Sequence, residues 1–280
     1  MARVPPNVRL LTGVKLLFSE AKSDYGHYLF PYVVWAMPEP GEKPADLFNA
    51  GFLPAANRLD RFYLCRQIRV TLADFQPSSE NRRILRKGEG IAVQLVPRAE
   101  FAYTPVVRDF CKRCAEVRFG PGVMSEERLD ALYNSPVMTH LLVFTDHQTQ
   151  AQIGVATLYV VDGELAFYRF GFYDLDYFNR SLGLFMMTSA VTLLAECRFK
   201  HLYLGTCYSE SALYKTQFAG VEFFNGFCWT DNLAELKSLL HHDQEKNGRH
   251  LLESEEFRNE FYNGDLNRIT AASGFQVKLG

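Results

Sequence analysis

The chain has 280 residues, of which 48% are hydrophobic and 22% charged, and its formal net charge is −2 at pH 7. This composition is typical of a globular protein with a large core, and it excludes a disordered chain or a uniformly basic nucleic-acid binder. Six cysteines in so long a chain do not suggest a disulfide framework, so we expect a reduced, cytoplasmic protein.

In chain order, residues 1–20 are predicted to form a short helix or arm, without the apolar core of a signal peptide. Strands are expected at 28–37, 62–72, 90–96, 141–145, 153–161, 165–172, 202–204 and within 218–229. Helices are expected at 44–50, 103–117, from 125 onward, at 183–197 and within 231–260. Another is expected after Pro77, with Arg82, Arg83, Arg86 and Lys87 in its first turns. The mixture predicts an α/β (α+β) fold.

Positive charge is concentrated in one segment of the chain. Between residues 58 and 87 there are eight Arg and Lys residues against three Asp and Glu, although the whole chain is slightly acidic. A confined basic face suits contact with a few phosphates. An ordinary solvated helix face is the alternative that the sequence leaves open.

The segment from 174 to 215 contains a polar loop, an almost uncharged helix and a short core strand, in that order. The loop ends in Arg180-Ser181-Leu182-Gly183, where backbone N–H groups at the start of the helix form a natural anion site. The loop approximates the pyrophosphate loop of GNAT acyltransferases. Phe185 stands where that loop has a second small residue, so we expect it to hinder the diphosphate of coenzyme A. The helix is shorter than the ~20 residues that span a bilayer.

Several stretches together resemble the aminoacyl-tRNA–protein transferases, which comprise the arginyltransferases and their bacterial leucyl counterparts. The resemblance covers roughly residues 25–230. It rests on the run from Phe75 to Arg83, on Phe172-Tyr173-Asp174 with the loop at 180–183, and on Tyr203-Leu204-Gly205, Tyr214-Lys215 and Trp229. The family has a Gln where this chain has Asn81.

The resemblance implies a tandem GNAT-like acyltransferase fold, with halves at 1–100 and 101–280. It also implies transfer of leucine or arginine from charged tRNA to the N-terminal α-amine of proteins that begin with Asp or Glu, in the N-degron pathway. No cofactor and no metal are expected, and Cys111 and Cys114 have no second Cys or His pair at zinc-site spacing. The expected partners are charged tRNA and acceptor proteins, with no membrane, and the protein is expected to be a monomer.

Three groups of site residues follow from the residues present and from the resemblance. The expected catalytic residues are Tyr203 and Tyr208, as wall and hydrogen-bond groups, and Asp174 or Glu210, which would hold the attacking ammonium. The expected substrate-binding residues are Arg180, Ser181, Gly183, Tyr214 and Lys215, where Lys215 or Arg180 would receive an acidic side chain or a phosphate. The expected tRNA-binding residues are Arg69, Arg82, Arg83, Arg86 and Lys87.

The donor is expected to be leucine rather than arginine. The stretches expected to line the site, 167–185 and 203–218, contain only Asp174, Asp176 and Glu210 as acids, and a buried guanidinium is costly without a paired carboxylate. Two other functions stay open: a coenzyme A-dependent GNAT N-acetyltransferase, and a non-catalytic RNA-binding module that uses the basic, aromatic strand at 62–72.

Overall fold

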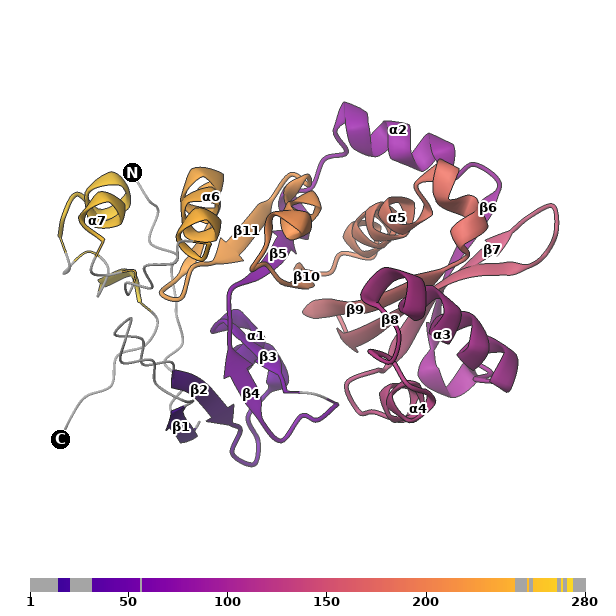
Figure 1. Cartoon of the computed structure of the whole chain (residues 1–280), viewed down its shortest axis with the longest axis horizontal. Coiled ribbons are helices and arrows are strands. Elements are labelled where there is room, and N and C mark those ends of the chain that lie inside the picture. Colours follow the sequence, from indigo (N-terminus) through magenta and orange to yellow (C-terminus); the bar gives the residue numbers. More distant parts are fainter. Residues whose placement is uncertain are drawn as a thin grey trace.

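The computed structural model describes residues 15–20, 32–55, 57–244 and 254–265, together with residues 251, 268 and 271–273. An eight-stranded sheet runs through the molecule beside a smaller sheet of four strands (Figure 1). The mixed α/β class is confirmed. The division into tandem GNAT-like halves at residue 100 stays a prediction, and strands from both sides of that residue occur in the large sheet.

The small sheet is antiparallel, and its strand order is β1-β2-β4-β3. Its strands are β1 (Lys15–Glu20), β2 (Tyr32–Met37), β3 (Phe52–Pro54) and β4 (Phe62–Leu64), and α1 (Pro44–Asn49) precedes β3. The expected helix or arm at 1–20 is therefore a strand where it is described, because residues 15–20 pair with β2 along their whole length. Residues 1–14 and 28–31 lie outside the described part.

The large sheet has the order β12-β11-β5-β10-β9-β8-β7-β6. Its strands are β5 (Gln67–Thr71), β6 (Ile91–Pro97), β7 (His140–Asp146), β8 (Gln152–Val161), β9 (Leu165–Tyr173), β10 (His201–Thr206), β11 (Val221–Phe224) and β12 (Trp229–Thr230). All neighbouring strands are antiparallel except β9 and β10, which are parallel. The expected hairpin at 162–163 is confirmed between β8 and β9.

Helices lie on both sides of the large sheet (Figure 1). They are α2 (Ser79–Lys87), α3 (Pro105–Phe119), α4 (Glu126–Tyr133), α5 (Leu182–Glu196), α6 (Leu233–His242) and α7 (Glu255–Tyr262), with short 3-10 turns η1 (Leu72–Asp74), η2 (Arg98–Glu100), η3 (Leu175–Arg180) and η4 (Glu210–Thr216). No helix in the described ranges has the length and apolarity needed to cross a bilayer.

The expected single strand at 62–72 is wrong, because the chain leaves one sheet and enters the other within it. The break falls at Cys65 and Arg66. The N–H of Cys65 donates to the carbonyl of Gly51 beside the small sheet, whereas the carbonyl of Arg66 accepts from Cys207 beside the large sheet. The apolar residues of β4 and β5 therefore pack in two different hydrophobic cores.

An aromatic cluster joins α1 to the large sheet. The ring of Phe48 lies 5.0 Å from Tyr203, 5.5 Å from Phe167 and 5.9 Å from Tyr159, measured between ring centroids. Aromatic pairs at such distances add stability beyond their buried area. Because Phe167 and Tyr203 belong to β9 and β10, this cluster holds the two parallel strands together at one end.

The α5 helix has apolar residues on most sides and is largely buried, as its sequence predicts. The α2 helix packs against it, and the contact depends on Gly88, which follows α2. A Cβ atom at Gly88 would lie 2.0 Å from the ring of Phe185, so the two helices approach as closely as they do only because this residue is glycine. At its other end α2 begins in a capping box, in which Ser78 and Asn81 exchange side-chain to backbone hydrogen bonds of 3.1 Å.

This packing yields a stability prediction. We expect Gly88→Ala to lower the free energy of unfolding by about 1–3 kcal/mol, because the added methyl group overlaps the Phe185 ring. Chemical denaturation measures the change. The double variant Gly88→Ala/Phe185→Leu should lose less than the sum of the two single variants, since the smaller side chain relieves the overlap. Additive losses would contradict this account of the α2–α5 contact.

Candidate functional site

The site is created where β9 and β10 part. The two strands pair only from Leu165 to Phe167 and from His201 to Tyr203. Directly afterwards each strand has a bulge: Arg169 has no counterpart on β8, and Leu204 has none on β5. Bulges bend a strand and increase its twist. The two bulges therefore lie where the parallel strands diverge, and the space between the strands is open.

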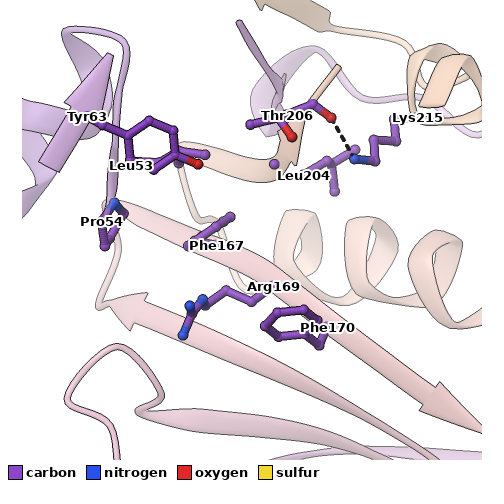
Figure 2. Close-up of a pocket in the computed structure, with 10 residues that line it drawn as sticks. Leu53, Pro54, Tyr63, Phe167, Arg169, Phe170, Leu204, Thr206 and Lys215 are labelled. Atoms are coloured by element: carbon purple, nitrogen blue, oxygen red, sulfur yellow. Dashed lines mark hydrogen bonds between the residues drawn. The ribbon is translucent and has the colours of Figure 1, made fainter. Parts of the chain in front are cut away.

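Two cavities occupy this opening. The smaller has a volume of about 260 Å³ and extends to Leu53, Pro54 and Tyr63 of the small sheet (Figure 2). The larger has a volume of about 660 Å³ and extends to the end of α3 and the start of α5. They share five lining residues, namely Arg169, Phe170, Leu204, Thr206 and Lys215. The arrangement is a two-sided site. Two molecules, one entering each cavity, would meet between β9 and β10.

Cations line the meeting point of the two cavities. Figure 2 shows the guanidinium of Arg169 pointing toward Pro54, and Lys215 on the other side of the cavity, where its Nζ donates to the Thr206 carbonyl at 2.9 Å. Burial lowers the pKa of Lys215, and it lowers the pKa of Arg169 to about 10. Among the described residues that line either cavity, none is Asp or Glu. A partly buried cation is stabilised by an anion, so the site favours a carboxylate, a phosphate or an oxyanion.

The start of α5 forms one wall of the larger cavity. Ser181 precedes the helix in the left-handed conformation, with φ 55°. Gly183 leaves room for the ring of Tyr173, which would be 2.7 Å from a Cβ atom at that position. The expectation that Phe185 hinders a diphosphate here is wrong. Its ring is buried against Phe144, with centroids 6.0 Å apart, and it does not line the cavity.

The basic helix α2 reaches this same wall. Its last residue, Lys87, donates from Nζ to the Oγ of Ser181 at 3.4 Å. Arg82, Arg83 and Arg86 lie on the exposed surface of α2, and Arg83 is paired with Glu80. The end of the basic helix therefore lies against Ser181, which lines the larger cavity, a relation that the sequence alone did not show.

Four of the five expected substrate-binding residues meet at the larger cavity. Ser181, Gly183, Tyr214 and Lys215 all line it, although they come from different elements. Arg180 ends η3, and its side chain lies outside the described part of the structure. The roles of these residues stay predictions.

The four expected catalytic residues do not line either cavity. Tyr203 is fully buried, and its hydroxyl donates to the Oδ1 of Asn49 at 2.8 Å. The hydroxyl of Tyr208 accepts from the backbone N–H of Arg66 at 2.8 Å, although its side chain is half-exposed. Asp174 accepts from the N–H of Asp176, and Glu210 is exposed at the start of η4. Their catalytic roles remain untested predictions.

Arg69 differs from the other expected tRNA-binding residues because it lies inside the structure. Its Nε donates to Glu222 at 2.9 Å, and its guanidinium lies 3.9 Å from the ring centre of Trp229. Only 11% of the side chain is exposed. These contacts join β5 to β11 and β12, so Arg69 contributes to the fold whether or not it also contacts RNA.

Sequence reasoning missed Arg169, Arg118 and Phe119, which all line the site. A signal was present for Arg169, since it is the one charged residue in the apolar stretch 165–172. A charged side chain in a buried strand calls for a partner or a function. Arg118 and Phe119 gave no such signal, because the end of an amphipathic helix usually faces solvent.

No family model matches the chain. In sequence it is similar to proteins named aspartate/glutamate leucyltransferase: one from Ruegeria sp. (strain TM1040) is 26% identical over 173 residues, covering 59% of this chain and 61% of the relative. Another, from Paramagnetospirillum magneticum (strain ATCC 700264 / AMB-1), is 29% identical over 171 residues, covering 59% of this chain and 68% of the relative. The match thus spans about three-fifths of the length of the first of these relatives.

Among solved structures, the chain is similar to the C-terminal domain (DUF2156) of a putative lysylphosphatidylglycerol synthetase from Agrobacterium fabrum, with a TM-score of 0.38 and 16% identity over 61% of this chain and 54% of that chain. It is also similar to FemX, with a TM-score of 0.37 and 8% identity over 70% of this chain and 80% of that chain. Scores this low do not assign a fold. The sequence comparison supports a distant relation to the leucyltransferase family.

Proposed function

We propose that this protein is an aminoacyl-tRNA–protein transferase, which moves leucine from charged tRNA to the N-terminal α-amine of proteins that begin with Asp or Glu. The observation that carries the proposal is the two-sided cavity between β9 and β10, with Arg169 and Lys215 where its two sides meet. The names of the curated relatives support the same reaction. The N-degron pathway is the setting that such a reaction implies.

The larger cavity is the proposed donor side. The basic helix α2 adjoins it through Lys87 and Ser181, so the phosphates of a tRNA 3′ end can lie along α2 while the aminoacyl group enters the cavity. Apolar side chains of Leu182, Leu184 and Met187 line the same space. A leucyl side chain gains a few kcal/mol from such burial, whereas an arginyl side chain would need a carboxylate that the described lining lacks.

The smaller cavity is the proposed acceptor side. It is lined by Tyr63 and Phe167, with Arg169 and Lys215 at its inner end. The Nη1 of Arg169 donates to the Oδ1 of Asn57 at 3.1 Å, which holds the guanidinium in place. An acceptor N-terminus that enters here can place its side-chain carboxylate against Lys215 while its α-amine faces the donor.

The proposed reaction needs little help from a general base. An α-amine has a pKa of about 7.7–8, so roughly a tenth or more of it is uncharged and nucleophilic near neutral pH. Its nitrogen attacks the carbonyl carbon of the aminoacyl ester and forms the new C–N bond. The C–O bond to the tRNA ribose breaks, and the ribose oxygen takes the proton that the amine loses. Most of the rate acceleration is expected to come from two effects: the two cavities position the reactants, and a nearby cation stabilises the oxyanion.

A coenzyme A-dependent N-acetyltransferase is the second candidate. The observation in its favour is the start of α5 at the larger cavity, which suits a diphosphate and is not blocked by Phe185. The basic helix beside that cavity and the named relatives favour tRNA. The proposed enzyme needs no cofactor. We propose that it acts as a monomer in the cytoplasm, with charged tRNA and acceptor proteins as its partners.

One assay tests the proposal directly. Peptides that differ only in their N-terminal residue are incubated with purified leucyl-tRNA, arginyl-tRNA or acetyl-CoA, and the products are identified by mass. We expect the mass of leucine to be added to peptides that begin with Asp or Glu. A higher kcat/KM with arginyl-tRNA would overturn the choice of donor. Acetylation without aminoacyl transfer would overturn the proposed function.

Lys215→Ala is expected to raise the KM for an Asp-starting peptide roughly tenfold or more, because a charged hydrogen bond of about 1.5–3 kcal/mol is lost. The KM for charged tRNA should stay unchanged. Lys200→Ala is the matched control, since Lys200 is an exposed lysine outside both cavities. Loss of tRNA affinity with an unchanged peptide KM would show that the role of Lys215 is wrongly assigned.

The lowered pKa of Lys215 predicts a pH dependence. Below this pKa the ammonium is charged and binds a carboxylate; as pH rises through it, the charge and the attraction are lost. The ratio of kcat/KM for an Asp-starting to an Asn-starting peptide should therefore fall with rising pH, at a pH below that of free lysine. The ratio cancels the titration of the α-amine. In Lys215→Arg the fall should move to higher pH, because a guanidinium holds its proton more strongly than an ammonium.

The basic face of α2 gives a further prediction. Replacing both Arg82 and Arg83 with Ala should weaken tRNA binding and reduce the slope of log K against log salt concentration by about 1.5, since two phosphate contacts are lost. Arg58→Ala/Arg61→Ala removes two charges from the same basic segment but away from α2, and it should leave the slope unchanged. Equal slopes for the wild type and the α2 variant would show that the basic face of α2 is solvated and makes no contact with tRNA phosphates.

A further inference from the structure

Exposed aromatic side chains gather at the mouth of the larger cavity. Within the described ranges, the large aromatic residues that are clearly exposed are Phe119, Tyr208 and Tyr214. Two of these three, Phe119 at 41% and Tyr214 at 45% exposure, line that one cavity although they come from α3 and η4. An exposed aromatic ring loses the benefit of burial, so two at one opening indicate a ligand that covers them.

Arg118 lies beside Phe119 and lines the same cavity. Its guanidinium carbon is 5.4 Å from the ring centre of Phe119 and 4.9 Å from that of Tyr173, and its Nη1 donates to the carbonyl of Gly171 at 3.4 Å. The guanidinium therefore lies against two aromatic rings, those of Phe119 and Tyr173, in the cavity that Tyr214 also lines.

Aromatic faces and an arginine plane are the groups on which unpaired nucleobases stack in RNA-binding proteins. Groups that can bind the phosphate of such a nucleotide are also at hand, because Ser181 lines the same cavity and Lys87 donates to it. An acidic peptide would also be attracted to Arg118, but it would make no use of the two exposed rings.

We propose that Arg118, Phe119 and Tyr214 form a stacking site for the unpaired 3′-terminal nucleobase of the donor tRNA. This assignment rests on the proposed function, and it places the base at the mouth of the larger cavity with the aminoacyl ester further in, toward Lys215. The adenine of a coenzyme A molecule has the same stacking chemistry, so the test must separate the two sources.

The experiment uses tRNA whose terminal adenosine is replaced by 2-aminopurine, a base whose fluorescence is quenched on stacking. Wild-type protein should quench it. Phe119→Ala/Tyr214→Ala should abolish most of the quenching and weaken tRNA binding about tenfold. Phe119→Trp should retain both. Val117→Ala, which removes exposed apolar surface from the same helix outside the cavity, should bind as the wild type does.

A tRNA that lacks its terminal nucleotide provides the decisive comparison. Wild type and the double variant should bind this shortened tRNA equally, because the base that distinguishes them is absent. A tenfold difference that persists with the shortened tRNA would overturn the proposal, as would normal quenching by the double variant. Displacement of the fluorescent tRNA by coenzyme A at lower concentration than by adenosine-ended tRNA would assign the site to coenzyme A instead.

The binding readout does not need aminoacyl transfer, so the two proposals can fail separately. Quenching that depends on Phe119 and Tyr214, without transfer to any peptide, would keep the stacking site and remove the proposed function. Leucyl transfer without quenching would keep the proposed function and remove the stacking site.

Discussion

The rest of the site depends on one constraint, the limited pairing of β9 with β10. At one end, Phe167 and Tyr203 are the last paired residues, and both rings pack on Phe48 of α1. Immediately beyond, the bulges at Arg169 and Leu204 turn the strands apart. The aromatic cluster fixes where the strands stay together, and the bulges fix where the space opens.

This divergence explains why the site has two sides. A continuous sheet would separate the side of α1 and the small sheet from the side of α5. Because β9 and β10 part beyond Phe167 and Tyr203, the two cavities share Arg169, Thr206 and Lys215. The proposed transfer between two large substrates would benefit from this geometry, since neither would have to leave before the other binds.

The charge distribution follows the same division. Cations lie on α2, at the end of α3 and at the junction of the cavities, whereas the net charge of the whole chain is slightly negative. Some of the arginines in the basic segment instead form ion pairs within the structure. Arg69 is paired with Glu222 and covered by Trp229, and Arg66 is paired with Asp243 at the end of α6. Counting charges along the chain therefore overstates the number available for an anionic ligand.

The sequence by itself determined what depends on neighbours along the chain. The β8–β9 hairpin, the capped start of α2, the apolar helix α5 and the strand β10 follow from turn residues, caps and hydrophobic periodicity. So do the positions of Ser181, Gly183, Tyr214 and Lys215 near one another, because loop, helix and strand come in that order.

Only the tertiary structure decided the remainder, because it depends on residues far apart in sequence. The break at Cys65 arises because the chain pairs with two different sheets on either side of it. The alternation of apolar residues over 62–72 does not indicate this break. Phe185 faces Gly88 rather than the cavity, since α2 packs on α5 there. Arg118 and Phe119 reach the site because α3 ends beside the free edge of β9, and Arg169 enters it because a bulge turns the strand. Long-range pairing and strand bulges, which periodicity does not encode, placed these groups together.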